Sequence, residues 1–341
     1  MNHSLRTPFF TRLGRASGLR RWGWALALLT GLGALYMPAH AQTDYPNKPV
    51  KLIVAFPPGG ANDIIGRLIA KELSTLWGQP VVVDNKGGAN GAIGMQAAAK
   101  SPPDGYTLVL GTAGPMAMSP ALQTVPYDPE RDFTAIVNLV DSPHALAVHT
   151  KTGANNVLEF VQKSKQASKP WNYSSPGIGN SGHLAMELLK LQTGMPITHI
   201  AYKGAGPALA DLLGGHVEAY FTSSAALVPH LSSPNVRVLG VTSRTRLPIM
   251  PLVPTMAESG LQGFDFAVWS GLLGPAGMPP AVVQKINADA NRILANPEFL
   301  EQLKKNAMNP WGGTPQQYAA TISSDLQKWR KIIKDGQIKA E

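Results

Sequence analysis

The sequence contains no cysteine among its 341 residues. This absence excludes disulfide bonds, thiolate nucleophiles and cysteine-ligated metals. Stability must therefore come from a hydrophobic core, and the residues after position 41 are numerous enough to form two domains of ordinary size. The sequence also lacks a Walker A loop and a Gly-x-Gly-x-x-Gly motif after a strand. We therefore expect no cofactor.

Acidic residues are missing from the first 41 positions, which contain five arginines. An uncharged, mostly apolar run from Trp22 to Tyr36 follows, and Ala39-His40-Ala41 places small residues where signal peptidase cuts. We expect residues 1–41 to be a secretory signal peptide that is cleaved after Ala41. An uncleaved membrane anchor is the alternative, but the apolar run is shorter than the roughly 20 residues that a membrane span requires.

Removal of this segment changes the charge of the chain. Five of the 30 basic residues are lost, which leaves 25 basic and 21 acidic residues. The remaining sequence has no basic block of the kind that binds nucleic acid, so we expect no nucleic-acid partner. A slightly positive surface suits a small anionic ligand.

The stretch from Leu52 to Asp63 combines a short apolar strand, the loop Pro57-Pro58-Gly59-Gly60 and the start of an amphipathic helix. Asn62 or Asp63 is the expected helix cap. The glycines leave backbone amides uncovered at the helix N-terminus, where the helix dipole favours an anion such as a carboxylate. A tight strand–helix turn without a ligand explains the glycines equally well.

The same succession of strand, glycine or small polar residues, and helix occurs five times, after Phe56, Asn85, Ser174, Tyr202 and Phe221. Strands that alternate with helices predict parallel β-sheets. Loops at the carboxyl ends of such strands are where ligands bind. These loops supply amides and hydroxyls with few charges, which predicts a pocket for a small anion.

The C-terminal part has a different pattern. A strand is expected at Phe264–Leu273, and three amphipathic helices are expected at Pro279–Leu294, Pro297–Lys305 and Pro315–Asp335. The first of these helices carries an apolar face and should cover a sheet.

Six motifs occur together along the chain: Tyr45-Pro-x-Lys-Pro-Val-Lys-Leu-Ile-Val-x-Phe-Pro-Pro-Gly-Gly60, Gly78-Gln-Pro-Val-Val-Val83, Pro102-Pro-Asp-Gly-Tyr-Thr-Leu108, Tyr202-Lys-Gly204, Asp211-Leu-Leu-Gly-Gly215 and Val253-Pro-Thr255. In combination they resemble the Bug family, the extracytoplasmic solute receptors of tripartite tricarboxylate transporters. The resemblance implies an α/β, two-domain periplasmic-binding-protein fold (type II, Venus flytrap). Each domain would be a mainly parallel sheet flanked by helices.

The resemblance also implies domain boundaries and a function. Residues 42–138 would form the first segment of domain 1, residues 139–240 domain 2, and residues 241–341 the returning segment of domain 1. The protein would be a monomeric periplasmic receptor and not an enzyme. It would capture a small carboxylate by domain closure and deliver it to membrane transporter subunits.

The binding loops of the family fall on four stretches of this sequence and on the end of the third strand. The implied ligand-binding residues are Phe56, Gly59, Gly60, Ala61, Asn62, Thr112, Ser175, Asn180, Ser181, Gly182, His183, Tyr202, Lys203, Gly204, Thr222 and Ser223. Two positions depart from the family pattern, because Thr222 stands where Asp is common and Ser174 where Gly is usual. Thr222 cannot hold an ammonium group, which favours a plain di-acid or an aromatic acid over an amino acid.

Several of these residues have a second interpretation. His183 is more consistent with a capping or packing role than with a metal site that it would share with Glu187. Lys203 either contacts a carboxylate or points to solvent. Tyr202 and Trp269 could stack on a ligand ring, although a core position suits Trp269 better.

Two other functions remain open at this point. A secreted hydrolase acting through Ser181 is one, although the surrounding glycines lack the spacing of a nucleophile elbow and nothing joins Asp211 and His199 into a triad. A receptor that presents its ligand to a membrane signalling system is the other.

Overall fold

The computed structural model describes residues 45–264, 266 and 268–340, so the expected signal peptide lies outside the described residues. None of the helices in the described residues is sufficiently long and apolar to cross a membrane. The strands are β1 Val50–Val54, β2 Val81–Asn85, β3 Thr107–Thr112, β4 Phe133–Asp141, β5 His144–His149, β6 Trp171–Ser175, β7 Ile197–Ala201, β8 Ala219–Ser223, β9 Val236–Val241, β10 Trp269–Pro275 and β11 Asn309–Gly312.

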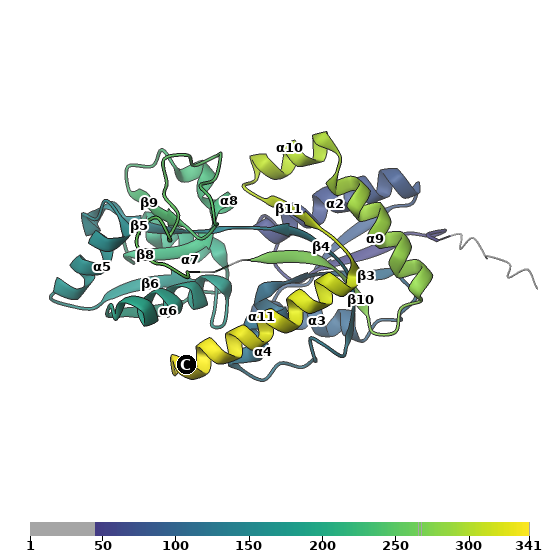
Figure 1. The fold of residues 1–341 in the computed structure, drawn as a ribbon, viewed down its shortest axis with the longest axis horizontal. Coiled ribbons are helices and arrows are strands. Elements are labelled where there is room, and N and C mark those ends of the chain that lie inside the picture. Colours follow the sequence, from purple (N-terminus) through teal and green to yellow (C-terminus); the bar gives the residue numbers. More distant parts are fainter. Residues whose placement is uncertain (1–44, 265, 267, 341) are drawn as a thin grey trace, which may run out of the picture. The chain divides into compact units, whose positions relative to one another are not determined.

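Helices follow most of the strands (Figure 1). The α-helices are α2 Ala61–Trp77, α3 Ala92–Ala99, α4 Ser119–Leu122, α5 Val157–Gln166, α6 Ser181–Thr193, α7 Ala205–Leu213, α8 Ser224–Leu227, α9 Pro280–Leu294, α10 Pro297–Lys305 and α11 Pro315–Asp335. Short helical turns are η2 Ala89–Gly91, η3 Gly114–Met118, η4 Thr150–Thr152 and η5 Val228–His230.

The first sheet has six strands in the order β11-β4-β10-β3-β1-β2. β1 pairs in parallel with β2 and β3, whereas β10 lies antiparallel between β3 and β4. β10 and β11 therefore run against the other four strands. The expected strand at Phe264–Leu273 begins later, at Trp269, because its first partner is Asp141, the last residue of β4.

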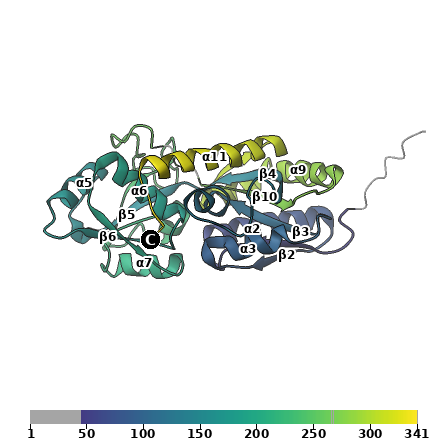
Figure 2. The ribbon, with the colours of Figure 1, turned by 90° about the horizontal axis from the view of Figure 1, so that it is seen from below.

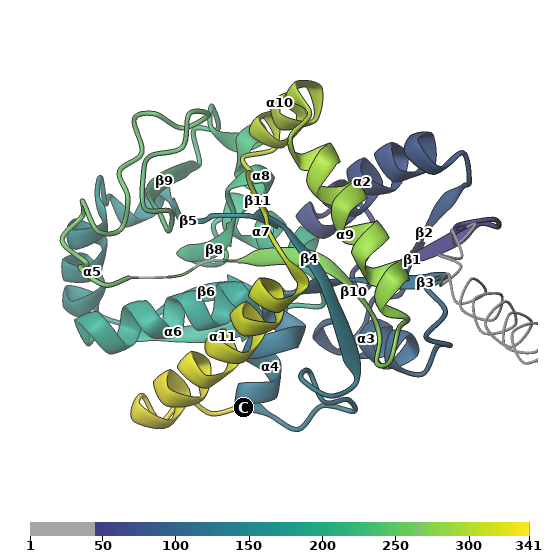
Figure 3. The ribbon, with the colours of Figure 1, turned by 45° about the vertical axis from the view of Figure 1, so that its right-hand side comes forward.

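Alternating side chains of β1 give this sheet two buried faces. Leu52 and Val54 pack with apolar residues of α2 and α9, and those two helices lie together over one face (Figure 3). Ile53 and Ala55 belong to the core on the opposite face, which α3 and α11 cover. α9, α10 and α11 occupy the three predicted C-terminal ranges, apart from a start one residue later in α9, and each begins with a proline at its first position.

The second sheet has five strands in the order β7-β6-β8-β5-β9. β6, β7 and β8 are parallel, and β5 is antiparallel to both β8 and β9. Leu146 and Val148 of β5 face a core shared with α5 and α6, whereas Ala145 and Ala147 face a core shared with α7 and α8. In both sheets the parallel strands release their loops at their carboxyl ends.

The chain passes between the two sheets twice. The first crossing is Ser142 and Pro143, which separate β4 from β5, and the second leads from β9 back to β10. The Ser142 amide donates to the carbonyl of Val268, at 2.8 Å, so the two crossings are hydrogen-bonded to each other.

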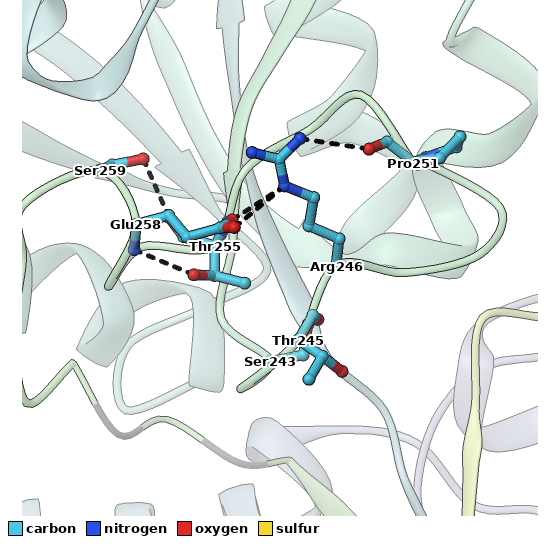
Figure 4. A network of polar contacts seen from close by, with 7 residues as sticks. All are labelled: Ser243, Thr245, Arg246, Pro251, Thr255, Glu258 and Ser259. Carbon is cyan, nitrogen blue, oxygen red and sulfur yellow. Dashed lines mark hydrogen bonds and ion pairs between the residues drawn. The ribbon is translucent and has the colours of Figure 1, made fainter.

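The segment between β9 and β10 is organised by polar contacts (Figure 4). Glu258 accepts from Arg246 Nε at 2.9 Å and from the Thr255 amide at 2.7 Å. In return, the Thr255 hydroxyl accepts from the Glu258 amide at 3.0 Å. Arg246 and Glu258 are about half exposed, so this ion pair orders the loop but adds little to global stability.

The long helix α11, which Figure 2 shows from the side, contacts α4 and η3. Trp329 of α11 is 1% exposed and makes an edge contact with the ring of Phe266 near the second crossing. Trp269 at the start of β10 is also 1% exposed, and its indole donates to Asp325 of α11. The alternative that placed Trp269 in the core is therefore confirmed.

Candidate functional site

The loop after β1 opens the N-terminus of α2. The helix begins at Ala61 with Gly60 as its N-cap, so the expected capping by Asn62 or Asp63 is wrong. Asp63 instead lies in the first turn and accepts from the Gly59 amide at 3.0 Å, as well as from Arg67 Nε at 2.9 Å. The hydrogen bond from the Gly59 amide to Asp63 takes the place of a side-chain cap, because the N-cap residue Gly60 has no side chain.

Asp63 is almost fully buried. Burial raises the pKa of its carboxyl, but hydrogen bonds from Arg67, Gly59 and Asn85 outweigh that effect and hold the pKa below its usual range. Asn85 Nδ2 donates both to Asp63 Oδ1 and to the Phe56 carbonyl, each at 3.0 Å. The ionised carboxylate of Asp63 therefore holds the loop after β1 in place.

This arrangement divides the amides of the first loop into two groups. Gly59 is already engaged by Asp63. The amides of Gly60, Ala61 and Asn62 donate to no group within the described residues. Three adjacent free amides at the positive end of a 17-residue helix are groups that can donate to an anion.

The loop after β6 opens the N-terminus of α6 in the second sheet. Asn180 is the N-cap, and its Oδ1 accepts from the Gly182 amide at 2.9 Å. The Ser181 amide donates to no group within the described residues. This helix end offers a second place where an anion can meet a helix dipole.

Three histidines support the loop from Ser175 to His183. His144 Nε2 lies 2.9 Å from Ser181 Oγ, and His199 Nε2 lies 2.6 Å from Ser175 Oγ. His183 Nδ1 accepts from the Gly179 amide at 3.1 Å. The rings of His183 and His199 are stacked with their centres 4.1 Å apart. The loop is thus held at both ends and in the middle.

These histidines are held in the neutral form. Burial lowers the pKa of His144 to about 4, although the nearby Ser142 carbonyl acts in the opposite direction. Burial, with a smaller effect from Lys190, lowers the pKa of His183 to about 4. Burial and the neighbouring His183 lower the pKa of His199 to about 3. A neutral ring is required at His183, because its Nδ1 must be free of a proton to accept from an amide.

The loops after β7 and β8 contribute differently. The Tyr202 hydroxyl donates to Asp211, and the Gly204 amide donates to the Pro176 carbonyl at 3.2 Å. Lys203 is exposed. Thr222 is buried in β8 opposite Ala145. These contacts join the loops after β6 and β7 into one unit.

Other polar groups at the strand ends are buried. Thr112 lies at the end of β3, opposite Ser270 of β10, and is 2% exposed. The hydroxyls of Ser223, the last residue of β8, and Ser224, the first residue of α8, are buried and have no hydrogen-bond partner among the described residues. Two unpartnered hydroxyls at a strand end are groups that a ligand or water can satisfy.

Side-chain contacts connect loops of the two sheets directly. Asn180 Nδ2 donates to Asn90 Oδ1 at 3.3 Å, and Ser119 Oγ donates to the Gly179 carbonyl at 3.3 Å. Sequence reasoning missed Asn90, Ser119 and His144, and it considered His199 only as a member of a triad, not as a support of this loop. Asn90 stands in a glycine-rich loop and could have been found there, whereas no local pattern marks the other three.

Other kinds of site receive little support. Among residues 45–264, 266 and 268–340 no group of three or more His, Asp or Glu side chains could hold a metal ion. Glu187, the metal partner that the disfavoured alternative for His183 would need, binds Lys190 at 2.7 Å and accepts from the Tyr173 hydroxyl. A cavity of about 350 Å³ lies between α11 and the strands β4 and β10, and none of the expected ligand-binding residues lines it.

Comparison with known proteins identifies the family. The model of the tripartite tricarboxylate transporter family receptor matches residues 65–338. BugT of Bordetella pertussis is 34% identical over 312 residues, which cover 91% of this chain and 95% of BugT.

Two similar solved structures contain ligands. An R. palustris protein with adipate has a TM-score of 0.82 and 34% identity, with 86% of this chain and 99% of that chain covered. MatC from Rhodopseudomonas palustris, with bound malate, has a TM-score of 0.77 and 28% identity, with 85% and 100% covered. The predicted two-domain α/β fold of the periplasmic-binding-protein type is confirmed, and both sheets are mixed where mainly parallel sheets were expected. The chain belongs to the Bug family, the receptors of tripartite tricarboxylate transporters.

Proposed function

We propose that this protein is a periplasmic receptor that captures a small dicarboxylate and delivers it to the membrane subunits of a tripartite transporter. The observation that carries the proposal is the pair of helix N-termini, one from each sheet. The free amides of Gly60, Ala61 and Asn62 open α2, and the free amide of Ser181 opens α6. Two anion sites suit a ligand with a carboxylate at each end.

Three further observations support a di-acid. Asn180, at the α6 helix end, donates to Asn90 in the loop after β2, and Asn85 at the end of β2 donates to Asp63 in the first turn of α2, so this chain of contacts leads from one helix end to the other. Thr222 stands where, by the family resemblance, an Asp that would attract an ammonium group is common. Relatives of similar fold hold adipate and malate. An aromatic acid remains the second ligand class to be tested.

Closure would occur about the two crossings. We propose that residues 42–138 and 241–341 form one domain and residues 139–240 the other, with export through a signal peptide cleaved after Ala41. The hydrogen bond between Ser142 and Val268 lets both crossings move together. We propose a monomer, which sedimentation velocity would test.

Thermal unfolding of residues 42–341 tests the ligand class. The panel contains adipate, malate, citrate, benzoate and phthalate, with adipamide as the uncharged match of adipate. A ligand at 100 times its dissociation constant should stabilise the protein by about 2.7 kcal/mol. We expect stabilisation by di-acids and none by adipamide. Stabilisation by adipamide alone would overturn the anion-site interpretation.

A serine hydrolase is the second candidate, because His144 lies within hydrogen-bond distance of Ser181. His144 Nδ1 faces the Ser142 carbonyl at 3.4 Å, where a triad would place a carboxylate. We therefore expect no turnover of p-nitrophenyl acetate above background. Turnover that disappears in Ser181→Ala would favour the hydrolase.

A further inference from the structure

One side-chain cluster joins the parts of the chain around the two sheets, and Asn180, the N-cap of α6, is the member that it shares with the helix ends assigned to the ligand. It consists of Asn90, Ser119, Gly179 and Asn180, which we call the clasp. Asn90 Nδ2 donates to Ser119 Oγ at 2.7 Å, and Ser119 Oγ donates to the Gly179 carbonyl at 3.3 Å. Asn180 Nδ2 closes the circuit on Asn90 Oδ1 at 3.3 Å.

The backbone at both sides is shaped for this contact. Asn90 has φ 50° and ψ 40°, a left-handed conformation that asparagine tolerates better than most residues. Gly179 has φ +70°, and a Cβ there would lie 3.3 Å from Ser119 Oγ and 3.4 Å from Leu122. Ser119 is 2% exposed, so its hydroxyl lies out of reach of bulk water. A glycine is required at 179 for this close approach.

The clasp also reaches the α6 helix end. Asn180 uses Oδ1 to cap the Gly182 amide and Nδ2 to bind Asn90. Hydrogen bonds therefore fix both the oxygen and the nitrogen of the Asn180 side-chain amide. The Gly179 peptide is held in the same manner, since its amide donates to His183 and its carbonyl accepts from Ser119.

We infer that the clasp is a closure contact that holds the two domains together and positions the α6 helix end for the ligand. The inference rests on the proposed function, because it assigns the control of that site. Loss of one or two neutral hydrogen bonds should raise the dissociation constant about three- to tenfold. Because the contact is made when the domains are closed, its loss should also increase the open population of the unliganded protein.

The test variant is Asn90→Gly, which keeps the left-handed backbone accessible and removes only the side chain. Ala89→Gly is the matched control, since Ala89 is the preceding residue, is exposed and also has a positive φ of 46°. Ser119→Ala removes the second arm of the clasp. The absence of native cysteine allows spin labels at Lys71→Cys on α2 and Lys165→Cys on α5, both exposed positions.

Double electron–electron resonance then measures the separation of the labels with and without adipate, and calorimetry measures adipate binding. We expect Asn90→Gly and Ser119→Ala to lengthen the distances without adipate and to weaken binding, whereas Ala89→Gly matches the wild type. If Asn90→Gly matches Ala89→Gly in the unliganded distances, the clasp does not control closure and the inference is wrong. If the wild type binds none of the di-acids of the thermal-unfolding panel, the di-acid proposal fails, and the unliganded distances still decide the role of the clasp.

Discussion

The imidazole of His144 and the hydroxyl of Ser181 lie 2.9 Å apart, although 37 residues separate them in the sequence. His144 Nδ1 faces the Ser142 carbonyl, which can only accept, so Nδ1 carries the proton and Nε2 accepts from Ser181. The ring also contacts Phe266, and the His144 amide donates to Thr242. One buried side chain therefore links both crossings to the first residue of α6.

This contact predicts an energetic coupling between the two residues. Ser181→Ala and His144→Phe should each lower the unfolding free energy by about 1–3 kcal/mol. Ser181→Ala leaves the buried Nε2 of His144 without its partner, and His144→Phe removes the imidazole that faces the Ser181 hydroxyl. In the double variant the total loss of unfolding free energy should be smaller than the sum of the two single losses by at least about 0.5 kcal/mol. Urea unfolding of the four proteins measures the coupling. Strict additivity would show that the hydrogen bond contributes nothing.

The three neutral histidines predict a loss of stability in acid. In the folded protein the pKa is about 4 for His144, about 4 for His183 and about 3 for His199, below the ordinary value of 6.5. Between pH 6.5 and these values the unfolded chain therefore binds more protons than the folded protein. Stability is fully present above pH 6.5 and falls as the pH drops toward 4, by up to about 1.4 kcal/mol per pH unit for each histidine. Urea unfolding at closely spaced pH values measures the slope.

The matched control for this acid effect is His144→Gln. It removes one of the histidines whose pKa is lowered in the folded protein, a set that also includes His149, and should reduce the slope between pH 6.5 and 4 by up to about 1.4 kcal/mol per pH unit, which corresponds to one proton. Asp63, Glu159 and Glu258 also have lowered pKa values and lose their contribution at more acidic pH, so they cannot account for a change near pH 6. An unchanged slope in the variant would contradict a buried neutral His144.

The free amides of α2 predict a change that deletes a single donor. Ala61 is the first residue of the helix, where proline is well tolerated, and Gly60 has the extended conformation that a following proline requires. Ala61→Pro should weaken carboxylate binding about 10- to 100-fold, the worth of one charge-assisted hydrogen bond. Ala61→Ser retains the amide and should bind as the wild type does. Calorimetry with adipate separates the two variants, and equal affinities would remove Ala61 from the site.

The packing of α6 predicts opposite effects for two helical glycines. A Cβ on Gly182 would lie 2.2 Å from the Phe221 carbonyl oxygen, which is backbone and cannot move freely. Gly182→Ala should therefore displace the α6 helix end and lower the melting temperature by several degrees. Gly206 in α7 has nothing within 4 Å of its Cβ position, so Gly206→Ala should stabilise the protein by about 0.5–1 kcal/mol. Differential scanning calorimetry measures both, and equal shifts would contradict this packing.

The local elements followed from the sequence because their causes are local. The apolar run before Pro57 and the periodic apolar residues of α9 are sufficient to predict a strand and a helix. The prolines at 280, 297 and 315 each begin a helix, because the first helical position needs no amide donor and suits the fixed φ of proline. The sequence also predicted uncovered amides at the Gly59-Gly60 pair, because glycine has no Cβ to screen them, although it assigned the helix cap to Asn62 or Asp63 and the structure assigns it to Gly60.

Only the tertiary structure decided which groups are still available for a ligand. Gly59 appeared equivalent to Gly60 in the sequence, yet Asp63 occupies its amide in the folded protein. His144 carried no local signal, since its partner Ser181 comes from another strand–helix unit. Asn90 meets Asn180 across 90 residues of sequence. Hydrogen bonds of this kind depend on how two sheets and their crossings are placed, which periodicity and capping rules cannot specify.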